Sequence, residues 1–405
     1  MRVLLSTIGS RGDVQPLAGL AVQLRGLGHE ARFVTPPDFK DWIEDLGFHV
    51  TPIGPELRRM TVARPSVPAT PLTPEQRRQL AEATVAAQFE TVAGAAQGCG
   101  VIVAATALQI AAASVAEKLG IAYVFAAYSP NVLPSLHHAP PPLPPMPGVT
   151  PPSTTDVREL WALDAQRFGA LFGPALNAHR ATIGMAPVSD VRGYVFGRQP
   201  WLAADQTLGP WPESGDATVF QTGAWILPDG RPLSPELESF LDAGEAPIYF
   251  GFGSGRATPG VTVEMIAAAR ALGRRAIVSR GWAELSVAGD APDCLTIDEV
   301  NQQRLFTRVA AVVHHGGAGT TTAAAMAGAP QVVVPQVYDQ HYWAQRVEQL
   351  GIGAAHAPGA PTADSLAAAL TASLRSDVPT RVRSVATSMR HDGARVAAER
   401  LARYA

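Results

Sequence analysis

The 405-residue sequence predicts an α/β protein made of two doubly wound domains that face each other across a cleft. Two observations carry this prediction. Short apolar strands alternate with amphipathic helices, which is the order of a parallel sheet with helices on both faces. The alternation stops in the middle of the chain and then begins again, which indicates two such sheets. Ligands of these sheets collect at the carboxyl ends of the strands, so the two edges can share one cleft.

The first predicted domain covers residues 1–200. Leu17, Leu20 and Leu24 recur at the spacing of one helical face directly after the first strand. Further along, Thr73 begins a capping box that opens a long helix. The apolar strands of this half are expected at residues 2–7, 30–35, 48–51, 101–105 and 121–126.

Two proline-rich stretches interrupt the alternation. Residues 133–152 can form neither helix nor sheet ladder because proline donates no hydrogen bond. A mobile loop over the mouth of the cleft and a plain surface excursion both explain this stretch. Residues 201–232 are rich in Pro, Gly and Trp, and we interpret them as the linker between the domains. Between the two stretches a helix is expected over residues 157–184, with a break near Pro174.

The second predicted domain covers residues 233–385, where the alternation of strand and helix resumes. A final helix is expected over residues 379–404. Its end, residues 386–405, could pack back on the first domain, although the sequence does not show where it goes. The strands of this half are expected at residues 248–252, 276–279, 294–297, 310–313 and 331–334.

Composition argues against several classes of protein. The formal net charge of −3 gives no electrostatic reason to expect nucleic acid or an anionic membrane as a partner. Cys99 and Cys294 lie far apart in sequence, so a disulfide framework is not expected and the cytoplasm is the simplest location. The longest apolar runs fall short of the roughly 20 residues of a membrane span, and the apolar start of the chain is too short for a signal peptide.

The sequence HHGGAGTTT, residues 314–322, lies between an apolar strand and an alanine-rich helix. The N–H groups of such a turn and the positive end of the helix dipole attract an anion, and phosphate is the natural one. The histidines and threonines add donors, which suits a diphosphate. A tight turn with close helix packing is the simpler explanation of the glycines. Zinc is not expected, because His314 and His315 are neighbours on a strand and no CxxC, HExxH or HxH companion exists.

The turn after the first strand, residues 9–13, is the counterpart in the first half. It is neither GxGxxG nor a Walker A loop, so a dinucleotide dehydrogenase is poorly supported. Asp13 suits two roles. It can cap the following helix, or it can act at the edge of the cleft as a general base, which contributes about 10²- to 10⁴-fold in rate. The sequence leaves both roles open.

Asp339 and Gln340 follow another predicted strand. An acid beside an amide offers acceptors and donors to the vicinal hydroxyls of a sugar. The alternative is that Asp339 only caps the next helix.

Five motifs together resemble family 1 glycosyltransferases of the GT-B fold, which consists of two Rossmann-like domains. They are GSRGDVQP near the N-terminus, GFGS at 251–254, SRGW at 279–282, HHGGAGTT and VPQVYDQ. Their order matches over the whole chain, and the last two together are specific. The segments QPWLAAD and QTGAWILPD add a similarity to bacterial antibiotic glycosyltransferases of the vancomycin group and the macrolide type.

The resemblance implies an inverting, metal-independent transfer of a hexose or deoxyhexose from a dTDP or UDP carrier to a hydroxyl of an antibiotic-type acceptor, with no cofactor. The first domain would bind the acceptor, helped by the proline-rich loop and residues 154–161. The resemblance implies Asp13 as the base, Trp282 and Val300 near the nucleobase, and Asp339 with Gln340 on the sugar. The residues implied to hold the diphosphate are Ser10, Arg11, Gly12, Ser254, His315, Gly316, Gly317, Ala318, Gly319 and Thr320.

Two positions depart from the wider family. Many relatives use a histidine as the base with an aspartate behind it, whereas this chain has Asp13 itself, as in the glycopeptide enzymes. The plant enzymes bind ribose with a glutamate where this chain has Ala323, so the ribose contact is unassigned. Three other functions stay open. They are a sterol or lipid glucosyltransferase, which shares GSRGDVQP, a non-catalytic nucleotide-sugar-binding partner, and a sugar-nucleotide epimerase that would act without an acceptor.

Overall fold

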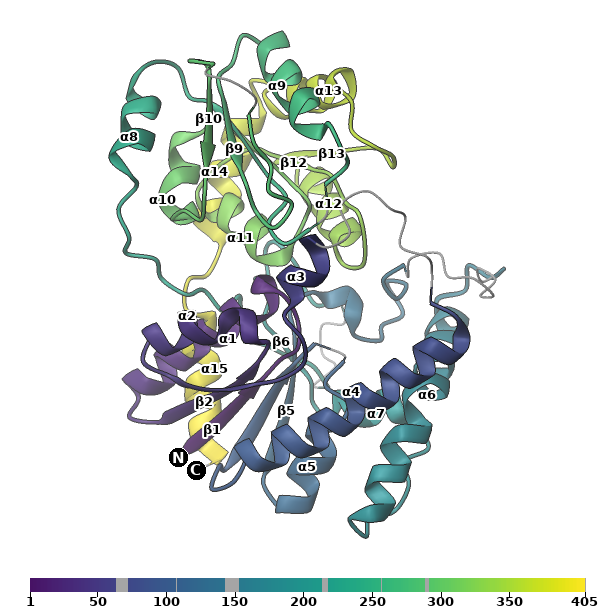
Figure 1. The fold of residues 1–405 in the computed structure, drawn as a ribbon. Helices are drawn as coiled ribbons and strands as arrows, with labels where there is room; N and C mark the ends of the chain where they lie inside the picture. Colours follow the sequence, from purple (N-terminus) through teal and green to yellow (C-terminus); the bar gives the residue numbers. More distant parts are fainter. Residues whose placement is uncertain are drawn as a thin grey trace.

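The computed structural model describes residues 1–62, 72–106, 108–142, 153–212, 218–255, 257–287 and 291–404. Two α/β domains, each built on a parallel sheet, lie one above the other in Figure 1. The predicted fold class is therefore confirmed. The second half of the predicted proline-rich loop, residues 143–152, lies outside the described residues.

The first sheet has the strand order β3-β2-β1-β4-β5-β6-β7. All of its pairs are parallel. Its central strands are fully buried, as at Val3, Leu5 and Val103, because helices cover both faces. The strands are β1 (Arg2–Ser6), β2 (Glu30–Thr35), β3 (His49–Pro52), β4 (Val101–Ala105), β5 (Ala122–Ala127), β6 (Trp201–Leu202) and β7 (Phe220–Gln221).

The helices of this domain begin largely where the sequence predicts. The hydroxyl of Thr73 accepts the N–H of Gln76 at 3.2 Å, which is the expected capping box of α4. The expected break at Pro174 is wrong, because Phe168, Phe172 and other buried side chains hold α6 on both sides of the proline. The helices are α1 (Arg11–Gly26), η1 (Pro37–Phe39), α2 (Lys40–Asp45), α3 (Leu57–Val62), α4 (Pro74–Ala95), α5 (Ala112–Leu119), η2 (Pro130–Val132), α6 (Val157–Thr182) and α7 (Val191–Phe196).

The second sheet is also parallel and has the order β10-β9-β8-β11-β12-β13. Its strands are β8 (Ile248–Gly251), β9 (Ala276–Ser279), β10 (Cys294–Ile297), β11 (Ala311–His314), β12 (Gln331–Val333) and β13 (Gly353–Ala355). Its helices are α8 (Pro235–Asp242), α9 (Val261–Ala271), α10 (Gln302–Leu305), η3 (Phe306–Arg308), α11 (Ala318–Met326), α12 (Gln340–Gln349), α13 (Ala363–Ser373) and α14 (Val378–Ser388).

The connection between the domains is shorter than the predicted linker at residues 201–232. Trp201 is fully buried and pairs with Ala126 at the edge of β5, and β7 continues the sheet beyond it. Both short strands therefore belong to the first domain, because a buried tryptophan is held by the core and not by a free linker.

The C-terminus returns to the first domain, in the way the sequence left open. The predicted final helix is two helices, α14 and α15 (Gly393–Leu401), followed by η4 (Ala402–Tyr404). Ala394, Ala397 and Leu401 of α15 share a core with Leu17 and Leu20 of α1. The N- and C-termini consequently lie near each other in Figure 1.

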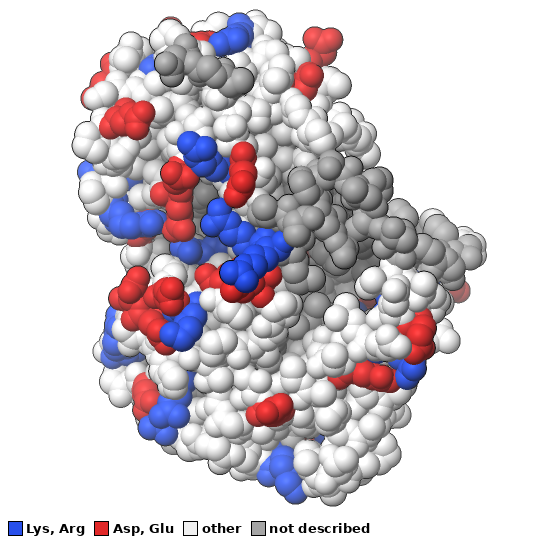
Figure 2. All heavy atoms as spheres, viewed as in Figure 1, with Lys and Arg blue, Asp and Glu red and all other residues white. Residues whose placement is uncertain are grey.

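The surface is mixed in charge. On the face shown in Figure 2, acidic and basic side chains alternate, particularly where the two domains meet. In the parts of the chain that the structure describes, every helix is too short or too polar to cross a membrane.

Candidate active site

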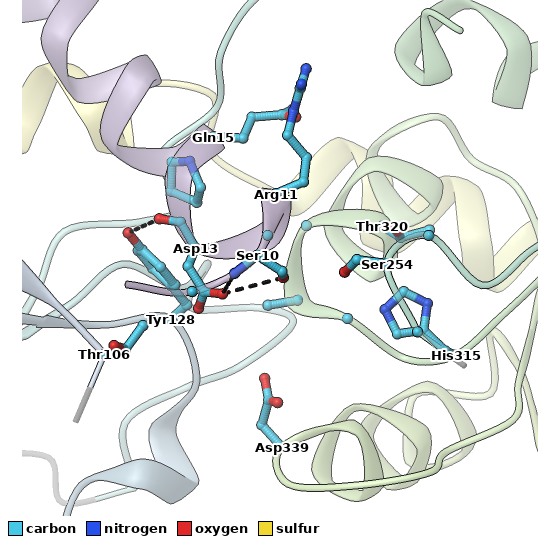
Figure 3. A pocket seen from close by; sticks show the side chains of 18 of the residues that line it. Ser10, Arg11, Asp13, Gln15, Thr106, Tyr128, Ser254, His315, Thr320 and Asp339 are labelled. Atoms are coloured by element: carbon cyan, nitrogen blue, oxygen red, sulfur yellow. Dashed lines mark hydrogen bonds between the residues drawn. The ribbon is translucent and has the colours of Figure 1, made fainter. Parts of the chain in front are cut away.

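A cavity of about 2250 Å³ lies between the carboxyl edges of the two sheets and takes its walls from both domains. It contains the turn after β1, the turn after β11 and the loop after β12, as Figure 3 shows. The structure thus brings together nearly all residues singled out in the sequence. Those that line the cavity are Ser10, Arg11, Gly12, Asp13, Ser254, Trp282, Val300, His315, Gly317, Ala318, Gly319, Thr320, Asp339 and Gln340.

Asp13 is held in the first turn of α1 by a capping box. Its Oδ2 accepts the N–H of Ser10 at 2.6 Å and the Ser10 hydroxyl at 3.3 Å. Gly9 makes this position possible, because a Cβ there would lie 2.0 Å from Oδ2. Both contacts go to one oxygen, and Asp13 is among the residues that line the cavity. Asp13 therefore closes the capping box of α1 and also lines the cavity, so its part in capping leaves the expected role as a base open.

Burial raises the pKa of Asp13 to about 6, although the hydrogen bonds from Ser10 oppose the shift. A carboxylate with this pKa is mostly ionised at pH 7 and is a stronger base than an ordinary aspartate. The group is therefore matched to accepting a proton near neutrality.

Asp339 lies across the cavity from Asp13, just before α12 (Figure 3). Its Oδ2 accepts the indole N–H of Trp343 at 3.1 Å and bonds no helix N–H, so helix capping does not explain this carboxylate. Burial, and then the charge of Asp13, raise the pKa of Asp339 to about 6. The neighbouring Gln340 uses its side-chain carbonyl to accept the N–H groups of Gln336 and Val337, which fixes the loop.

His314 and Gly316 do not take part in the cavity, contrary to the expectation from the sequence. His314 is fully buried, and its Nδ1 accepts the N–H of Gly316 at 3.1 Å while Nε2 lies 2.9 Å from Oε1 of Gln331. Gly316 has a φ of +91°, and a Cβ there would lie 2.7 Å from Val333. The N–H of Gly316 is thus already used inside the domain, which argues against the predicted diphosphate contact.

His315, by contrast, faces the cavity beside the N-terminus of α11 (Figure 3). Burial lowers its pKa to about 4, so the ring is neutral at pH 7. Its Nδ1 is buried and has no hydrogen-bond partner among the described residues. Gly317 allows the ring to approach, because a Cβ there would lie 2.7 Å from Nε2. The ring can thus offer one N–H to a ligand without carrying a charge.

The N-terminus of α11 is open to the cavity. Its N-cap is Gly317, which supplies no side-chain cap, and the first turn has no acidic residue. Of the three threonines in the turn, only Thr320 lines the cavity, because Thr321 and Thr322 are buried. Ser254 and Thr320 lie near this helix end in Figure 3. The arrangement leaves N–H groups and two hydroxyls for an anion.

Arg11 is committed to other partners. Its guanidinium makes an ion pair with Glu299 of the second domain at 2.9 Å, donates to Gln15 at 3.0 Å and lies 3.4 Å from the ring centroid of Trp42. In Figure 3 the side chain points away from His315 and Thr320. The structure therefore places Arg11 at the contact between the domains and not at the open end of α11.

Trp282 and Val300 line the second-domain side of the cavity. The ring of Trp282 stacks on Phe39 of the first domain, with centroids 6.1 Å apart and 19° between planes. Gly281 allows the chain to pass close to Gly253, since its φ is +55° and a Cβ would lie 2.4 Å from the carbonyl oxygen of Gly253. The N–H of Trp282 donates to that oxygen at 2.9 Å. Ala323, at the unassigned ribose position, also lines the cavity.

Sequence reasoning missed Tyr128 and Thr106. Tyr128 follows β5 and donates its hydroxyl to the carbonyl of Asp13 at 3.0 Å, so it fixes the first turn of α1. Thr106 follows β4 in a left-handed conformation, with φ of 77°, which is rare for a β-branched residue. Both lie at the carboxyl ends of strands that the sequence does predict, and that position was the available signal. Within the described residues, no cluster of His, Cys, Asp or Glu side chains is suited to hold a metal.

Two known domain families match this chain. Residues 3–137 match the glycosyltransferase family 28 N-terminal domain, and residues 263–399 match the C-terminal domain of proteins like erythromycin biosynthesis protein CIII. The first match lies within the first domain and contains β1 to β5, and the second contains β9 to β13 of the second sheet.

Curated relatives match over almost the full length. Three of them are from Amycolatopsis orientalis. Glycosyltransferase GtfE is 48% identical over 99% of this chain and 97% of its own length, and vancomycin aglycone glucosyltransferase is 47% identical over the same shares of the two chains. A dTDP-epi-vancosaminyltransferase is 43% identical over 95% of this chain and 93% of its own length.

Solved structures agree in fold. The glycotransferase of kitacinnamycin aligns with a TM-score of 0.73 over 100% of this chain and 98% of its own, at 18% identity. The glycosyltransferase VinC in complex with dTDP aligns with a TM-score of 0.67 over 100% and 99%, also at 18% identity. The fold is therefore GT-B, and the family follows from the full-length relatives. The chain therefore belongs to the antibiotic-type family of glycosyltransferases.

Proposed function

We propose that this enzyme transfers a hexose or deoxyhexose from a dTDP-sugar to a hydroxyl of a glycopeptide aglycone, with inversion at the anomeric carbon and without a metal ion. One observation carries the proposal. A carboxylate with a raised pKa, Asp13, faces an uncapped helix N-terminus and a second carboxylate, Asp339, across one cavity. Proton acceptance, anion stabilisation and sugar binding thus have separate groups.

The reaction needs a base on the acceptor side. Asp13 takes the proton of the acceptor hydroxyl, and the oxygen attacks the anomeric carbon from the face opposite the diphosphate. The bond from that carbon to the diphosphate oxygen breaks, and the diphosphate leaves with the electron pair. A single displacement of this kind inverts the anomeric configuration. Asp339 is suited to accept hydrogen bonds from the sugar hydroxyls while this happens.

The departing diphosphate gains negative charge as the bond breaks. The N–H groups at the start of α11, the hydroxyls of Thr320 and Ser254 and the N–H of neutral His315 can stabilise that charge where it develops. Fixed dipoles of this kind support a reaction without a divalent cation, because they perform the part that a metal would take.

The names of the relatives support the choice of donor and acceptor. One curated relative is a dTDP-epi-vancosaminyltransferase and another is a vancomycin aglycone glucosyltransferase, and the structure of VinC contains dTDP. The uncapped N-terminus of α11 is suited to any diphosphate. The choice of thymine as the nucleobase is therefore supported by these names alone.

The test combines three readouts in one assay. Wild-type protein is incubated with dTDP-glucose and vancomycin aglycone in excess EDTA, and the product is analysed by mass spectrometry and by the anomeric proton coupling in NMR. We expect one added hexose with a β linkage from the α-linked donor. An α linkage contradicts inversion, loss of turnover in EDTA contradicts metal independence, and isomerised donor without acceptor indicates an epimerase. UDP-glucose in a parallel incubation tests the nucleobase.

A further inference from the structure

Asp164 of α6 and Arg192 of α7 line the first-domain wall of the cavity. We propose that this pair forms a polar subsite inside an aromatic recess and selects acceptors that place a hydroxyl group there. The proposal rests on the proposed function, because it names a specificity determinant of the acceptor half of the same cavity. It concerns two residues to which the motifs in the sequence assign no role.

The pair is nearly enclosed. Oδ2 of Asp164 lies 2.6 Å from Nη1 of Arg192, and their side chains are 13% and 11% exposed. The guanidinium carbon of Arg192 lies 5.1 Å from the ring centroid of Phe168, 4.9 Å from that of Phe196 and 5.7 Å from that of Trp161. Phe168 also lines the cavity. An acceptor ring seated on this surface would meet the charged pair, the neighbouring Arg167 and the aromatic ring of Phe168.

Arg192 has a donor to spare. Its Nε is buried and has no hydrogen-bond partner among the described residues. An unpaired buried donor destabilises the folded state, and a buried ion pair is often no more stabilising than apolar side chains of the same size. Stability alone therefore explains the pair poorly. A ligand that completes its hydrogen bonds explains it better.

A second buried arginine, on the helix that carries Asp164, gives the contrast. Arg180, near the end of α6, is also buried and pairs with Glu117 of α5 at 3.0 Å. Its Nε donates to the carbonyl of Ala186, and its Nη1 also bonds Ser114 and Tyr194. Neither Arg180 nor Glu117 lines the cavity. The satisfied pair is away from the cavity, and the unsatisfied pair is in its wall.

The chemistry of the pair points to a hydroxyl. A hydroxyl can donate its proton to Asp164 and accept from Arg192, so one group uses both partners. The aromatic walls favour a ring beside that hydroxyl. The expected acceptor therefore carries a phenol, or an alcohol on an apolar ring system, at a position other than the one that receives the sugar.

The test measures binding of p-cresol and toluene, which differ by one hydroxyl, by ligand-observed NMR with saturating dTDP. The double variant D164L/R192M removes both charges and leaves no lone buried charge. We expect its affinity for p-cresol to fall at least tenfold, while the affinities for toluene and for dTDP stay within twofold. The matched control E117Q alters the other ion pair of α6 and is expected to change none of the three affinities.

Retention of p-cresol binding in the double variant overturns the proposal, as does equal loss of both probes, which would show a packing role, or absence of p-cresol binding to the wild type. If the double variant does not fold, D164N takes its place, with a loss of at least threefold for p-cresol alone. A wild type that binds p-cresol through the pair but transfers no sugar would break the proposed function and leave the subsite standing.

Discussion

The turn after β1 and the turn after β11 differ in how the following helix begins. At α1 the chain supplies its own anion, because Asp13 accepts the N–H of Ser10 and closes a capping box. At α11 the N-cap is Gly317 and no side chain of the described residues caps the helix. The first helix end is satisfied from within, and the second is left for a ligand. In the proposed mechanism, the same strand-to-helix geometry would serve a proton acceptor on one wall and an anion site on the other.

The titrating groups follow the same division. Burial raises the pKa of Asp13 to about 6 and lowers the pKa of His315 to about 4. Near pH 7 the first wall carries a carboxylate and the second a neutral ring. Burial has pushed both groups in the direction of their uncharged forms, and of these two only Asp13 titrates close to neutrality. The second wall also carries Asp339, whose pKa is likewise raised to about 6. Changes on the two walls should consequently give different kinetic signatures.

The largest effect is expected for Asp13→Asn. The amide keeps the shape and can still accept from Ser10, but it takes no proton from the acceptor. We expect kcat to fall by about 10²- to 10⁴-fold, with dTDP affinity by calorimetry unchanged within twofold. Turnover near the wild-type level would remove Asp13 from the mechanism.

On the opposite wall, His315→Ala should affect the anion. Loss of one donor to developing charge lowers kcat by about 10²- to 10³-fold, and here dTDP should also bind more weakly. The comparison with Asp13→Asn separates the two walls, because His315→Ala should change both kcat and the affinity for dTDP, whereas Asp13→Asn should change kcat alone. An unchanged dTDP affinity would mean that the ring makes no contact with the diphosphate.

Gly9→Ala tests how the carboxylate is placed. A Cβ at residue 9 would lie 2.0 Å from Oδ2 of Asp13, so the carboxylate must move. A displacement of about 1 Å can cost up to about 10²-fold in rate, and we expect a loss of 10- to 100-fold in kcat with donor binding intact. The control is Gly26→Ala at the end of α1, the helix that carries Asp13. There, no atom lies within 4 Å of the added Cβ. Equal rates for the two variants would show that Asp13 does not need its present position.

The sequence predicts the two sheets because strands buried on both faces are continuous apolar runs, which are easily recognised. The strand at Val101–Ala105 is an example. It does not predict that Trp201 pairs with β5, because two residues are too few to show a period. It also misplaces Gly316, since the glycine-rich motif gives no sign that His314 turns inward and takes the N–H of that residue. The direction of the His314 side chain depends on its partner Gln331 on the neighbouring strand β12, which the local sequence does not reveal.

The cavity shows the same limit. Asp13 and Asp339 are found from motifs, but their mutual repulsion depends on the approach of two domains, which no local pattern reports. The ion pair of Arg11 with Glu299 likewise joins residues 288 positions apart. Contacts of this range are set by how the whole chain folds.

The smallest expected effect is a shift in the pH dependence of kcat/KM. A base must be unprotonated to act, so kcat/KM should fall about tenfold per pH unit as the pH drops below about 6, the pKa of Asp13. His315 would give a limb near pH 4, so His315→Ala should leave the limb near 6 in place. Because repulsion between the two carboxylates acts on both, Asp339→Asn should move that limb to lower pH. A limb that disappears in His315→Ala, or that does not move in Asp339→Asn, would contradict the assignment of the base to the wall of α1.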